Sequence, residues 1–348
     1  MTADDVAAGP SAAVAMQLAG LWREVFGDEQ TRPDANFFAI GGTSLSAISF
    51  LGKLRESSGR AIGLDVLRAN PTLAALCAQV RAASVDESPD PLVLINAGVA
   101  RTPLVCLHSL TGTAVRYRNL AEDFPHARIY AFQSAGLLGG VQTAETLETL
   151  ADRYARRWIA ADAGAGILLG YSFGGVLANA VARRLDELGQ PPQLLILIDV
   201  RLDRIGSPSR AFHTEALRLL GGSLGVAAAL SGICDDALTV ESLAEAVHAS
   251  RQSTAITATD LSLWAEVMAT HLRLLADHTF EPYRGTTGFI AAAETGPPTW
   301  LDSGDHALIV VPGDHYSIFN VQSQWRLTAA VTTLTRRLAT HADWDVGR

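Results

Sequence analysis

The sequence predicts two folds in series: a small all-α helical bundle, then an α/β domain with a mostly parallel central sheet and a helical insertion. Two observations predict this order. Before residue 85, apolar residues recur at helical spacing without a competing strand pattern. After residue 91, short apolar runs alternate with amphipathic segments. Continuous apolar strands separated by helices imply a parallel sheet that is buried on both faces.

Length and composition bound the function. The chain has 348 residues, of which 48% are hydrophobic and 18% charged, so two domains with sizeable cores are expected. Its net charge of −9 argues against nucleic-acid binding, which needs a basic stripe. No long apolar run predicts a membrane span, and no signal-peptide pattern opens the chain, so we expect a cytoplasmic protein. Cys77, Cys106 and Cys234 are too few for a disulfide framework and indicate no metal site.

Three amphipathic stripes account for the first domain, which we place at residues 12–85. The first runs from Leu18 to Phe26 and the second from Leu45 to Leu54. The third begins at Asn70-Pro71, where asparagine is expected as the N-cap and proline as the first helical residue. Residues 86–91 are polar and end in proline, which predicts a linker before a second domain at residues 92–345.

The second domain is predicted from its strand and helix patterns. The expected strands are Leu92–Ile95, Leu104–Leu107, Ile129–Phe132, Ile167–Leu169, Leu194–Ile198, Phe289–Ala292 and Ala307–Val311. The expected helices are Thr146–Ala160, Gly174–Leu188 and Gln322–Thr340. Between the fifth and sixth strands, the patterns are helical over Ala211–Leu220, Leu243–Ala249 and Leu261–Ala276. We therefore predict a helical lid at about residues 204–283.

The strongest chemical signal is the run Gly-Tyr-Ser-Phe-Gly around Ser172. It follows an apolar strand and opens a helix, which is the setting of a nucleophile elbow. Glycines permit the close backbone approach that such a turn needs, and the helix N-terminus favours negative charge beside the serine. Ser172 is therefore the candidate nucleophile.

A serine nucleophile needs a base and a group that orients the base. Asp199 ends the strand after the elbow, and adjacent strand ends lie side by side, so it is the candidate acid; Asp203 is the nearest substitute. His306 precedes the last strand and belongs at the opposite end of the sheet, whereas His315 follows that strand at the end where Ser172 lies. We therefore expect His315 as the base. His271 and His278 fall in the insertion, where surface or packing roles are expected, or a place lining a substrate cavity.

Acyl transfer also needs amide donors for an oxyanion. Phe173, directly after the nucleophile, is expected to supply one, and the loop His108–Gly112 after an early strand is expected to supply another.

At these residues, positions 92–345 resemble the type I thioesterases that end nonribosomal peptide and polyketide synthases. The resemblance rests on the GYSFGG elbow, the acid after the next strand, the late GDHY loop and the helical segment before it. It implies an α/β-hydrolase fold and an acyl-enzyme on Ser172, with His315 as base and Asp199 orienting it. It also implies Leu110 as the second oxyanion donor, although the early loop departs from the family's His-Pro-x-Gly-Gly.

Residues 12–85 resemble a peptidyl carrier domain. The motif is Phe-Phe-Ala-Ile-Gly-Gly-Thr-Ser-Leu, which places Ser44 at a predicted helix start. On chemistry alone, a serine there is an N-cap. The resemblance implies 4′-phosphopantetheine attached to Ser44. Many relatives carry histidine or aspartate where this chain has Thr43, which leaves the module type open.

The two resemblances in this order predict that the chain releases a peptidyl or acyl thioester from its own carrier, by hydrolysis or macrocyclisation. The expected partners are upstream synthetase modules, a phosphopantetheinyl transferase and the peptidyl thioester, with no nucleic acid and no membrane. The alternatives are the end of a polyketide or hybrid line, a stand-alone serine esterase with a helical interaction domain, and a non-enzymatic docking module on a degenerate hydrolase fold.

Overall fold

The computed structural model describes two compact units. The described residues are 10–42, 44–60, 62, 66–67, 70–82, 90–114, 116–138, 146–162, 164–202, 212–250, 256, 258–298, 307–320 and 323–339. Thr43, Asp203, His306 and most of the predicted linker at 86–91 lie outside them. One unit takes Met1–Asp90, Ala135–Gln142 and Leu217–Ala265, and the other takes Pro91–Ser134, Thr143–Ala216 and Glu266–Arg348.

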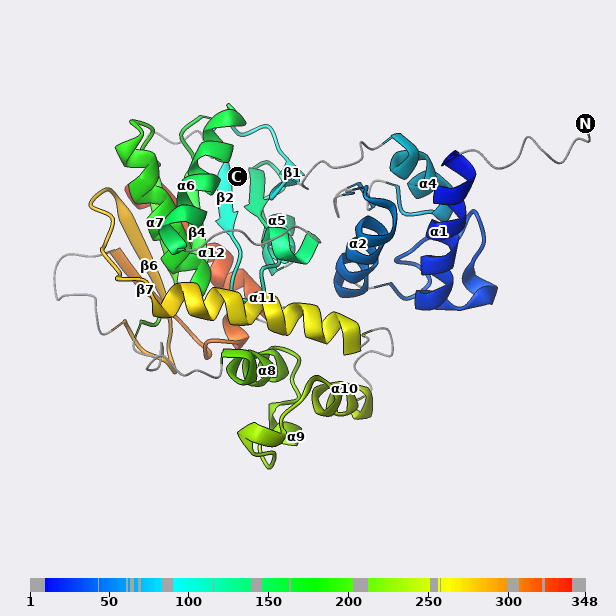
Figure 1. Ribbon diagram of the computed structural model, residues 1–348. Helices are drawn as coiled ribbons and strands as arrows, with labels where there is room; N and C mark the ends of the chain where they lie inside the picture. The colour runs from blue at the N-terminus through cyan, green and yellow to red at the C-terminus, as the bar shows by residue number, and fades with distance from the viewer. Residues whose placement is uncertain are drawn as a thin grey trace, which may run out of the picture. The chain divides into compact units, whose positions relative to one another are not determined.

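The three helices predicted for residues 12–85 are confirmed. They are α1 (Pro10–Phe26), α2 (Ser44–Ser58) and α4 (Leu73–Ala82), drawn in blue shades in Figure 1, with the short 3-10 turn η1 (Asp28–Gln30) after α1. Their core is aromatic, because the ring of Trp22 meets those of Phe37 and Phe50 edge-on at centroid distances of 5.4 and 5.8 Å. All three side chains are fully buried.

The predicted N-cap of the third helix was wrong. Helix α4 begins at Leu73, and the Thr72 hydroxyl accepts a hydrogen bond from the Ala75 amide at 3.3 Å. The Asn70 side chain instead donates to the Val66 carbonyl at 3.0 Å. The cap lies at Thr72 because a threonine hydroxyl can satisfy a first-turn amide as well as an asparagine can.

The second unit is built on a seven-stranded sheet in the order β1-β3-β2-β4-β5-β6-β7. Its strands are β1 (Leu92–Ala97), β2 (Leu104–Leu107), β3 (Arg128–Phe132), β4 (Ile167–Tyr171), β5 (Leu194–Ile198), β6 (Thr287–Ala292) and β7 (Ala307–Val311). β1 pairs antiparallel with β3 and the remaining pairs are parallel, so the prediction of a mostly parallel sheet is confirmed.

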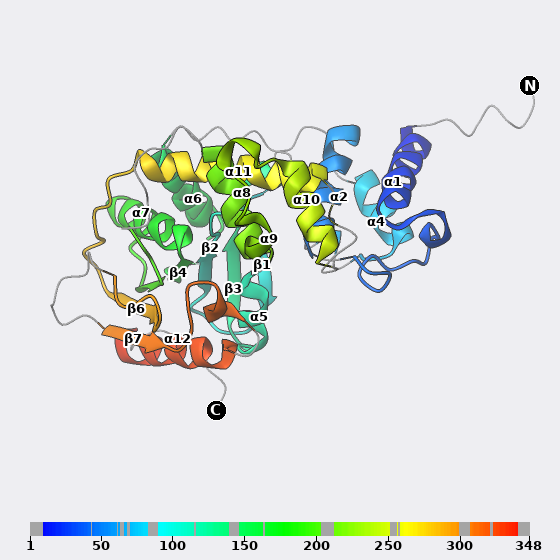
Figure 2. The ribbon, with the colours of Figure 1, turned by 90° about the horizontal axis from the view of Figure 1, so that it is seen from below.

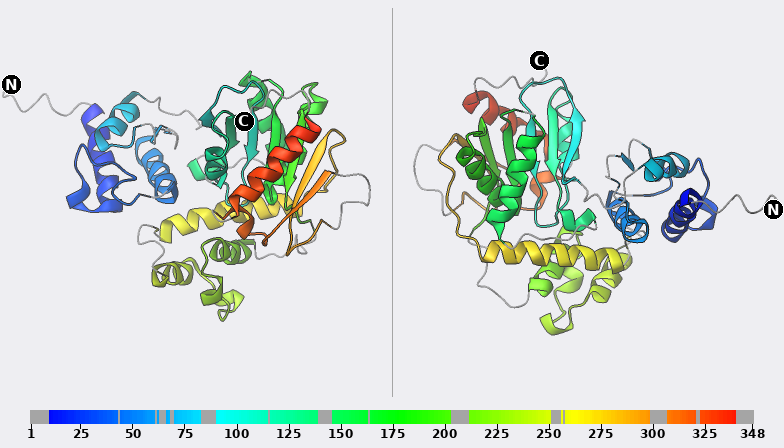
Figure 3. Two further views of the ribbon diagram at one scale, coloured as in Figure 1. Left: turned by 180° about the vertical axis from the view of Figure 1, so that it is seen from behind. Right: turned by 45° about the horizontal axis from the view of Figure 1, so that its top comes forward.

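Helices cover both faces of this sheet, as Figure 2 shows edge-on and Figure 3 from two sides. One face carries α6 (Leu147–Ala160) and α7 (Phe173–Glu187), and the other carries α5 (Arg116–Glu122) and α12 (Gln324–Leu338). The remaining described helices and turns are η2 (Ala135–Leu138), α8 (Phe212–Ser223), α9 (Ala227–Leu230), η3 (Asp235–Ala237), α10 (Val240–Ala249), α11 (Ala258–Ala276) and η4 (Ser317–Phe319). Between β5 and β6, α8, α10 and α11 agree with the three predicted helical patterns.

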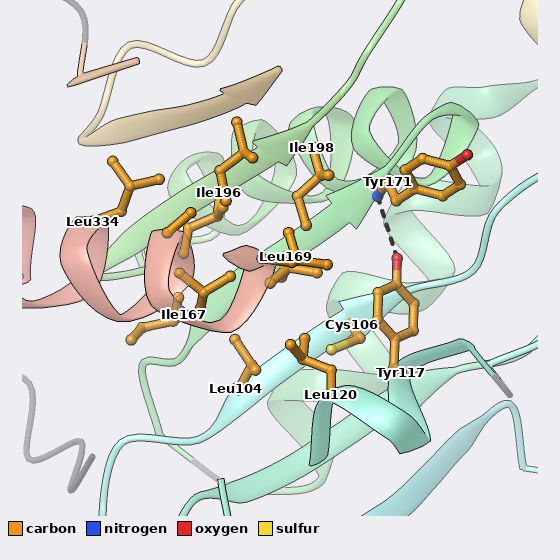
Figure 4. Close-up of a cluster of buried hydrophobic side chains, with 14 of the residues drawn as sticks. Leu104, Cys106, Tyr117, Leu120, Ile167, Leu169, Tyr171, Ile196, Ile198 and Leu334 are labelled. Carbon is orange, nitrogen blue, oxygen red and sulfur yellow. Dashed lines mark hydrogen bonds between the residues drawn. The ribbon is translucent and has the colours of Figure 1, made fainter. Parts of the chain in front are cut away.

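The sheet separates two apolar cores, because successive strand side chains point to opposite faces. Leu104 and Cys106 of β2 pack on the face of α5 and α12, whereas Val105 and Leu107 pack on the face of α6 and α7. Figure 4 shows the first of these cores, where side chains of β2, β4 and β5 meet α5 and α12. Burial on both faces explains why these strands read as continuous apolar runs. No described helix combines the length and the hydropathy needed to cross a bilayer.

Candidate active site

Ser172 occupies the sharp turn between β4 and α7. Its backbone has φ 57° and ψ −126°, a positive φ that is rare outside glycine. The turn is fixed by two backbone hydrogen bonds: the Ser172 amide donates to the Ile198 carbonyl at 3.0 Å, and the Gly175 amide donates to the Ser172 carbonyl at 2.9 Å. The serine is therefore held at the carboxyl end of a central strand, where open α/β sheets place their sites.

Glycines make this turn possible. A Cβ at Gly170 would lie 2.0 Å from the Gly174 carbonyl oxygen, and one at Gly174 would lie 2.5 Å from the Leu107 carbonyl oxygen. At Gly175 a Cβ would lie 2.1 Å from Val200 Cγ2. Helix α7 thus approaches its neighbouring strands more closely than any side chain allows, which explains the glycine spacing of the motif.

The three candidate triad residues lie in one hydrogen-bonded chain. His315 Nε2 is 3.0 Å from Ser172 Oγ, and His315 Nδ1 is 2.6 Å from Asp199 Oδ2. Since a carboxylate can only accept, the Nδ1 proton donates to Asp199 and leaves Nε2 able to accept from Ser172. This arrangement suits a serine nucleophile, a general base and an orienting acid.

Asp199 is buried and fully hydrogen-bonded. Its Oδ1 accepts from the Ala292 amide at 3.0 Å and from the Thr295 hydroxyl at 2.8 Å, while Oδ2 accepts from His315. Burial opposes its ionisation, but the hydrogen bonds from His315, Ala292 and Thr295 outweigh it, so the pKa of the Asp199 carboxyl lies below its usual value. The carboxylate therefore stays charged at neutral pH and can orient the imidazole.

The loop that carries His315 is shaped by Asp314. Asp314 Oδ1 accepts from the Tyr316 and Ser317 amides at 2.9 and 2.7 Å, which folds a compact turn before η4. The Tyr171 ring stacks on the His315 ring at 4.9 Å, and the Tyr171 hydroxyl donates to the His315 carbonyl. The residue before the nucleophile thus holds the histidine from two sides.

The two predicted oxyanion donors, Phe173 and Leu110, lie on segments that Tyr117 links by hydrogen bonds. Phe173 is the first residue of α7, and the first amides of a helix have no partner inside it. Leu110 lies in a turn closed by the Gly112 amide, which donates to the Ser109 carbonyl at 2.9 Å. The Tyr117 hydroxyl donates to the Leu107 carbonyl at 2.7 Å and accepts from the Tyr171 amide at 3.2 Å (Figure 4 draws the second bond). Tyr117 therefore links the strand before this loop to the elbow.

His108 and His271 are fully buried next to these donors. Burial is the main cause that lowers the pKa of His108 to about 3 and that of His271 to about 4, so both are neutral at neutral pH. His271 lies 2.7 Å, at Nδ1, from the Leu110 carbonyl oxygen. His278 instead lies beside Glu148, at 2.6 Å. The sequence indicates a surface, packing or cavity-lining role for His271, and the structure gives it a specific contact with the candidate oxyanion loop.

In the first unit, Ser44 is the first residue of α2. Gly41 precedes it with φ 103°, and a Cβ there would meet open space, whereas a Cβ at Gly42 would lie 2.3 Å from the Phe37 ring. The chain is therefore packed tightly at Gly42 and open at Gly41, directly before a helix N-terminus, which is suited to a phosphate group. An open backbone before a helix N-terminus can accommodate the phosphate of 4′-phosphopantetheine.

Comparisons with known proteins agree with this division. Residues 102–324 match the family model of thioesterase domains, and residues 17–80 match that of the phosphopantetheine attachment site. A dimodular nonribosomal peptide synthase of Bacillus subtilis is 29% identical over 187 residues, or 52% of this chain and 8% of that protein. The chain spans only 3% of the length of the first curated relatives that it matches.

Solved structures share the fold. The holo-AB3403 four-domain nonribosomal peptide synthetase matches 96% of this chain and 27% of its own, with a TM-score of 0.60 and 20% identity. The NocB thioesterase domain, in a covalent complex with a fluorophosphonate nocardicin G analogue, matches 70% of this chain and 98% of its own, with a TM-score of 0.52 and 22% identity.

The chain belongs to the thioesterase domain family, because that family's model covers more than half of it. With its phosphopantetheine attachment domain, it is a carrier–thioesterase didomain, and its second domain has an α/β-hydrolase fold. Its cofactor is 4′-phosphopantetheine, bound covalently to a serine of the carrier domain. A carrier followed by a thioesterase is consistent with release of a carrier-bound chain.

Proposed function

We propose that this protein releases a peptidyl or acyl chain from its own carrier domain through an acyl-enzyme on Ser172. The observation that carries the proposal is the hydrogen-bonded chain from Ser172 through His315 to Asp199. The proposed modification site is Ser44, at the start of α2. When attached, the cofactor supplies a thiol that holds the acyl chain as a thioester. The proposed domains are residues 12–85, the linker 86–91 and residues 92–345.

The acylation step follows from the geometry of the site. Ser172 Oγ attacks the thioester carbonyl carbon while His315 Nε2 takes the hydroxyl proton. Asp199 stabilises the imidazolium that forms, because its carboxylate accepts a hydrogen bond from His315 Nδ1–H, with Nδ1 and Oδ2 2.6 Å apart. The amides of Phe173 and Leu110 hold the oxyanion. The carbon–sulfur bond then breaks, and His315 gives its proton to the departing sulfur.

Release repeats the same proton movements. His315 removes a proton from water, or from an amine or hydroxyl of the acyl chain itself, and that nucleophile attacks the ester on Ser172. Ser172 Oγ leaves with the proton from His315. Water gives a free acid and an internal nucleophile gives a ring, so one site supports hydrolysis or macrocyclisation. The proposed partners are upstream synthetase modules, which supply the acyl chain, and a phosphopantetheinyl transferase, which modifies Ser44.

Intact-protein mass spectrometry tests the proposal. The wild type and Ser172→Ala are loaded with an acyl-coenzyme A and a phosphopantetheinyl transferase, and their masses are followed with time. We expect the variant to retain an acyl-pantetheine adduct that the wild type sheds, and Ser44→Ala to gain no adduct. Equal retention by the wild type and Ser172→Ala would refute the role of Ser172. A Ser44→Ala protein that still gains mass would refute the site of attachment.

A further inference from the structure

One buried imidazole contacts both residues that carry the candidate oxyanion donors. The ring of His271, in the C-terminal half of α11, stacks on the Phe173 ring with centroids 4.9 Å apart and an interplanar angle of 20°. The same imidazole lies 2.7 Å, at Nδ1, from the Leu110 carbonyl oxygen. His271 is fully buried, and all three residues belong to the same compact unit.

The direction of the hydrogen bond is fixed by chemistry. A carbonyl oxygen can only accept, so His271 Nδ1 carries the proton and donates it to Leu110. Burial holds the pKa of His271 at about 4, so the ring donates as a neutral imidazole and brings no positive charge next to the oxyanion. Any effect of His271 on the reaction therefore works through position rather than through charge.

The loop that His271 contacts is held at each end by other groups. At its start, His108 Nε2 lies 2.9 Å from the Tyr154 hydroxyl, and the His108 ring stacks on His271 at 4.8 Å. At its end, the Gly112 carbonyl accepts from the Ser134 amide at 2.8 Å. Between these ends, His108 Nδ1 lies 3.0 Å from the Ser109 carbonyl oxygen, which shares a peptide with the Leu110 N–H, and His271 binds the next carbonyl, that of Leu110. Because an oxyanion donor must stand within a few tenths of an ångström of its place, a hydrogen bond to the adjoining peptide affects the donor through the backbone of Leu110.

We propose that His271 is a positioning residue of the oxyanion hole: its hydrogen bond to the Leu110 carbonyl fixes the Leu110–Thr111 peptide, next to the Ser109–Leu110 peptide that carries the donor N–H, and its ring packs against Phe173. Both amides are thereby held facing the oxyanion on the substrate of Ser172. This inference rests on the proposed function. It adds a residue that acts through Leu110 and Phe173, 161 positions along the chain from Leu110.

Three substitutions separate the hydrogen bond from simple packing. His271→Phe keeps a ring against Phe173 and removes the donor. His271→Asn places an amide N–H near the position of Nδ1, whereas His271→Gln places it one bond farther out, near Nε2. His278→Asn is the matched control, since it removes another largely buried imidazole whose Nδ1 contact is to Glu148.

The readout is the kcat and KM for an acyl-pantetheine thioester, measured on the full chain beside its denaturant unfolding midpoint. Loss of a whole oxyanion donor lowers kcat roughly 100- to 1,000-fold, so a misplaced donor is expected to lower it about 10- to 100-fold in His271→Phe and His271→Gln. KM should change less than about threefold, because the interaction lost is made in the transition state. His271→Asn should recover to within about fivefold of the wild type, and His278→Asn should match the wild type.

The results that would overturn the positioning role differ from those that would overturn the proposed function. A wild-type kcat in His271→Phe, or equal losses in the Asn and Gln variants, would overturn the positioning role, as would a raised KM with kcat unchanged. If His271→Phe does not fold, the Asn and Gln variants decide the matter by themselves. Turnover by the wild type that is absent in Ser172→Ala keeps the proposed function intact whatever the His271 variants do. Absence of turnover by the wild type would overturn the proposed function and this inference with it.

Discussion

Replacing Asp199 with asparagine tests whether the carboxylate fixes the tautomer of His315, because it changes one oxygen to an amide nitrogen. The Asp199→Asn side chain has one oxygen, and its orientation is set by its neighbours. At the Oδ1 position, the Ala292 amide and the Thr295 hydroxyl both donate, at 3.0 and 2.8 Å. Turning the amide nitrogen toward them would face it with the Ala292 N–H, which can only donate, and leave that buried amide without a partner, at a cost of about 1–3 kcal/mol. The oxygen therefore stays there, and the nitrogen faces His315.

That orientation of the asparagine reverses the tautomer of His315. An amide nitrogen beside His315 Nδ1 can only donate, so Nδ1 must accept and the ring proton moves to Nε2. Nε2 then faces Ser172 Oγ, 3.0 Å away, with a proton of its own and cannot take the serine proton. In serine proteases the wrong tautomer lowers kcat about 10⁴-fold, equivalent to about 5 kcal/mol of transition-state free energy.

The assay is kcat for an acyl-pantetheine thioester, with Asp314→Asn as the control. Asp314 is the neighbouring carboxylate in the same loop, but it accepts from the Tyr316 and Ser317 amides rather than from the imidazole. We expect the control to keep kcat within about tenfold, because the asparagine oxygen can still accept those two bonds. A loss of less than tenfold in Asp199→Asn would refute the orienting role of Asp199.

Further predictions concern the glycines and the buried histidines. Gly170→Ala should lower the unfolding free energy by several kcal/mol, since its Cβ would lie 2.0 Å from a backbone oxygen; Gly20→Ala, in helix α1 with open space around it, should raise it by about 0.5–1 kcal/mol. Denaturant titrations check both, and a neutral Gly170→Ala would contradict the packing argument. Gly42→Ala should slow pantetheine attachment more than tenfold by mass spectrometry, because its Cβ would lie 2.3 Å from Phe37; an unchanged rate would count against a role for this turn. His108 and His271, with pKa values of about 3 and about 4 against 6.5 when unfolded, favour the neutral form on folding. The unfolded chain therefore binds more protons between pH 4 and 6.5, and stability should fall as the pH drops through that window; urea titrations at pH 7 and 5 should show a smaller fall in His271→Asn than in the wild type.

Much of the fold was predictable because its strands are buried on both faces. The bounds of β2, β5 and β7 agree with the sequence pattern at both ends. β2 and β5 are buried along their whole length, whereas the edge strand β7 is only partly buried but is still a continuous apolar run. Helix α5 (Arg116–Glu122) was not predicted: seven residues are too short to show a helical stripe. Its Tyr117 nevertheless links β2 to the elbow, through contacts that a local pattern does not contain.

Part of the candidate site was also predictable from the sequence, and part was not. Chain order and strand ends were enough to bring Ser172, Asp199 and His315 together, because topology fixes which loops share an edge of the sheet. The contact of His271 with Leu110 was not predictable, since it joins residues 161 positions apart across an insertion. A helical pattern indicates that His271 is buried or exposed but not which atom its nitrogen meets. The catalytic roles of all these residues remain predictions.

Two residues of the relay occupy backbone conformations that only glycine adopts freely. Ser172 has φ 57° and Asp199 has φ 44°. Such conformations cost about 1–3 kcal/mol each and persist only where the surrounding structure imposes them. Glycine at Ser172 would relieve that strain and remove the nucleophile in the same step, whereas glycine at Asp199 would also leave the Ala292 amide and the His315 imidazole without their acceptor. In a gene copy no longer under selection for acyl transfer, Ser172→Gly should therefore be tolerated, and it would give a stabler, inactive descendant in one substitution.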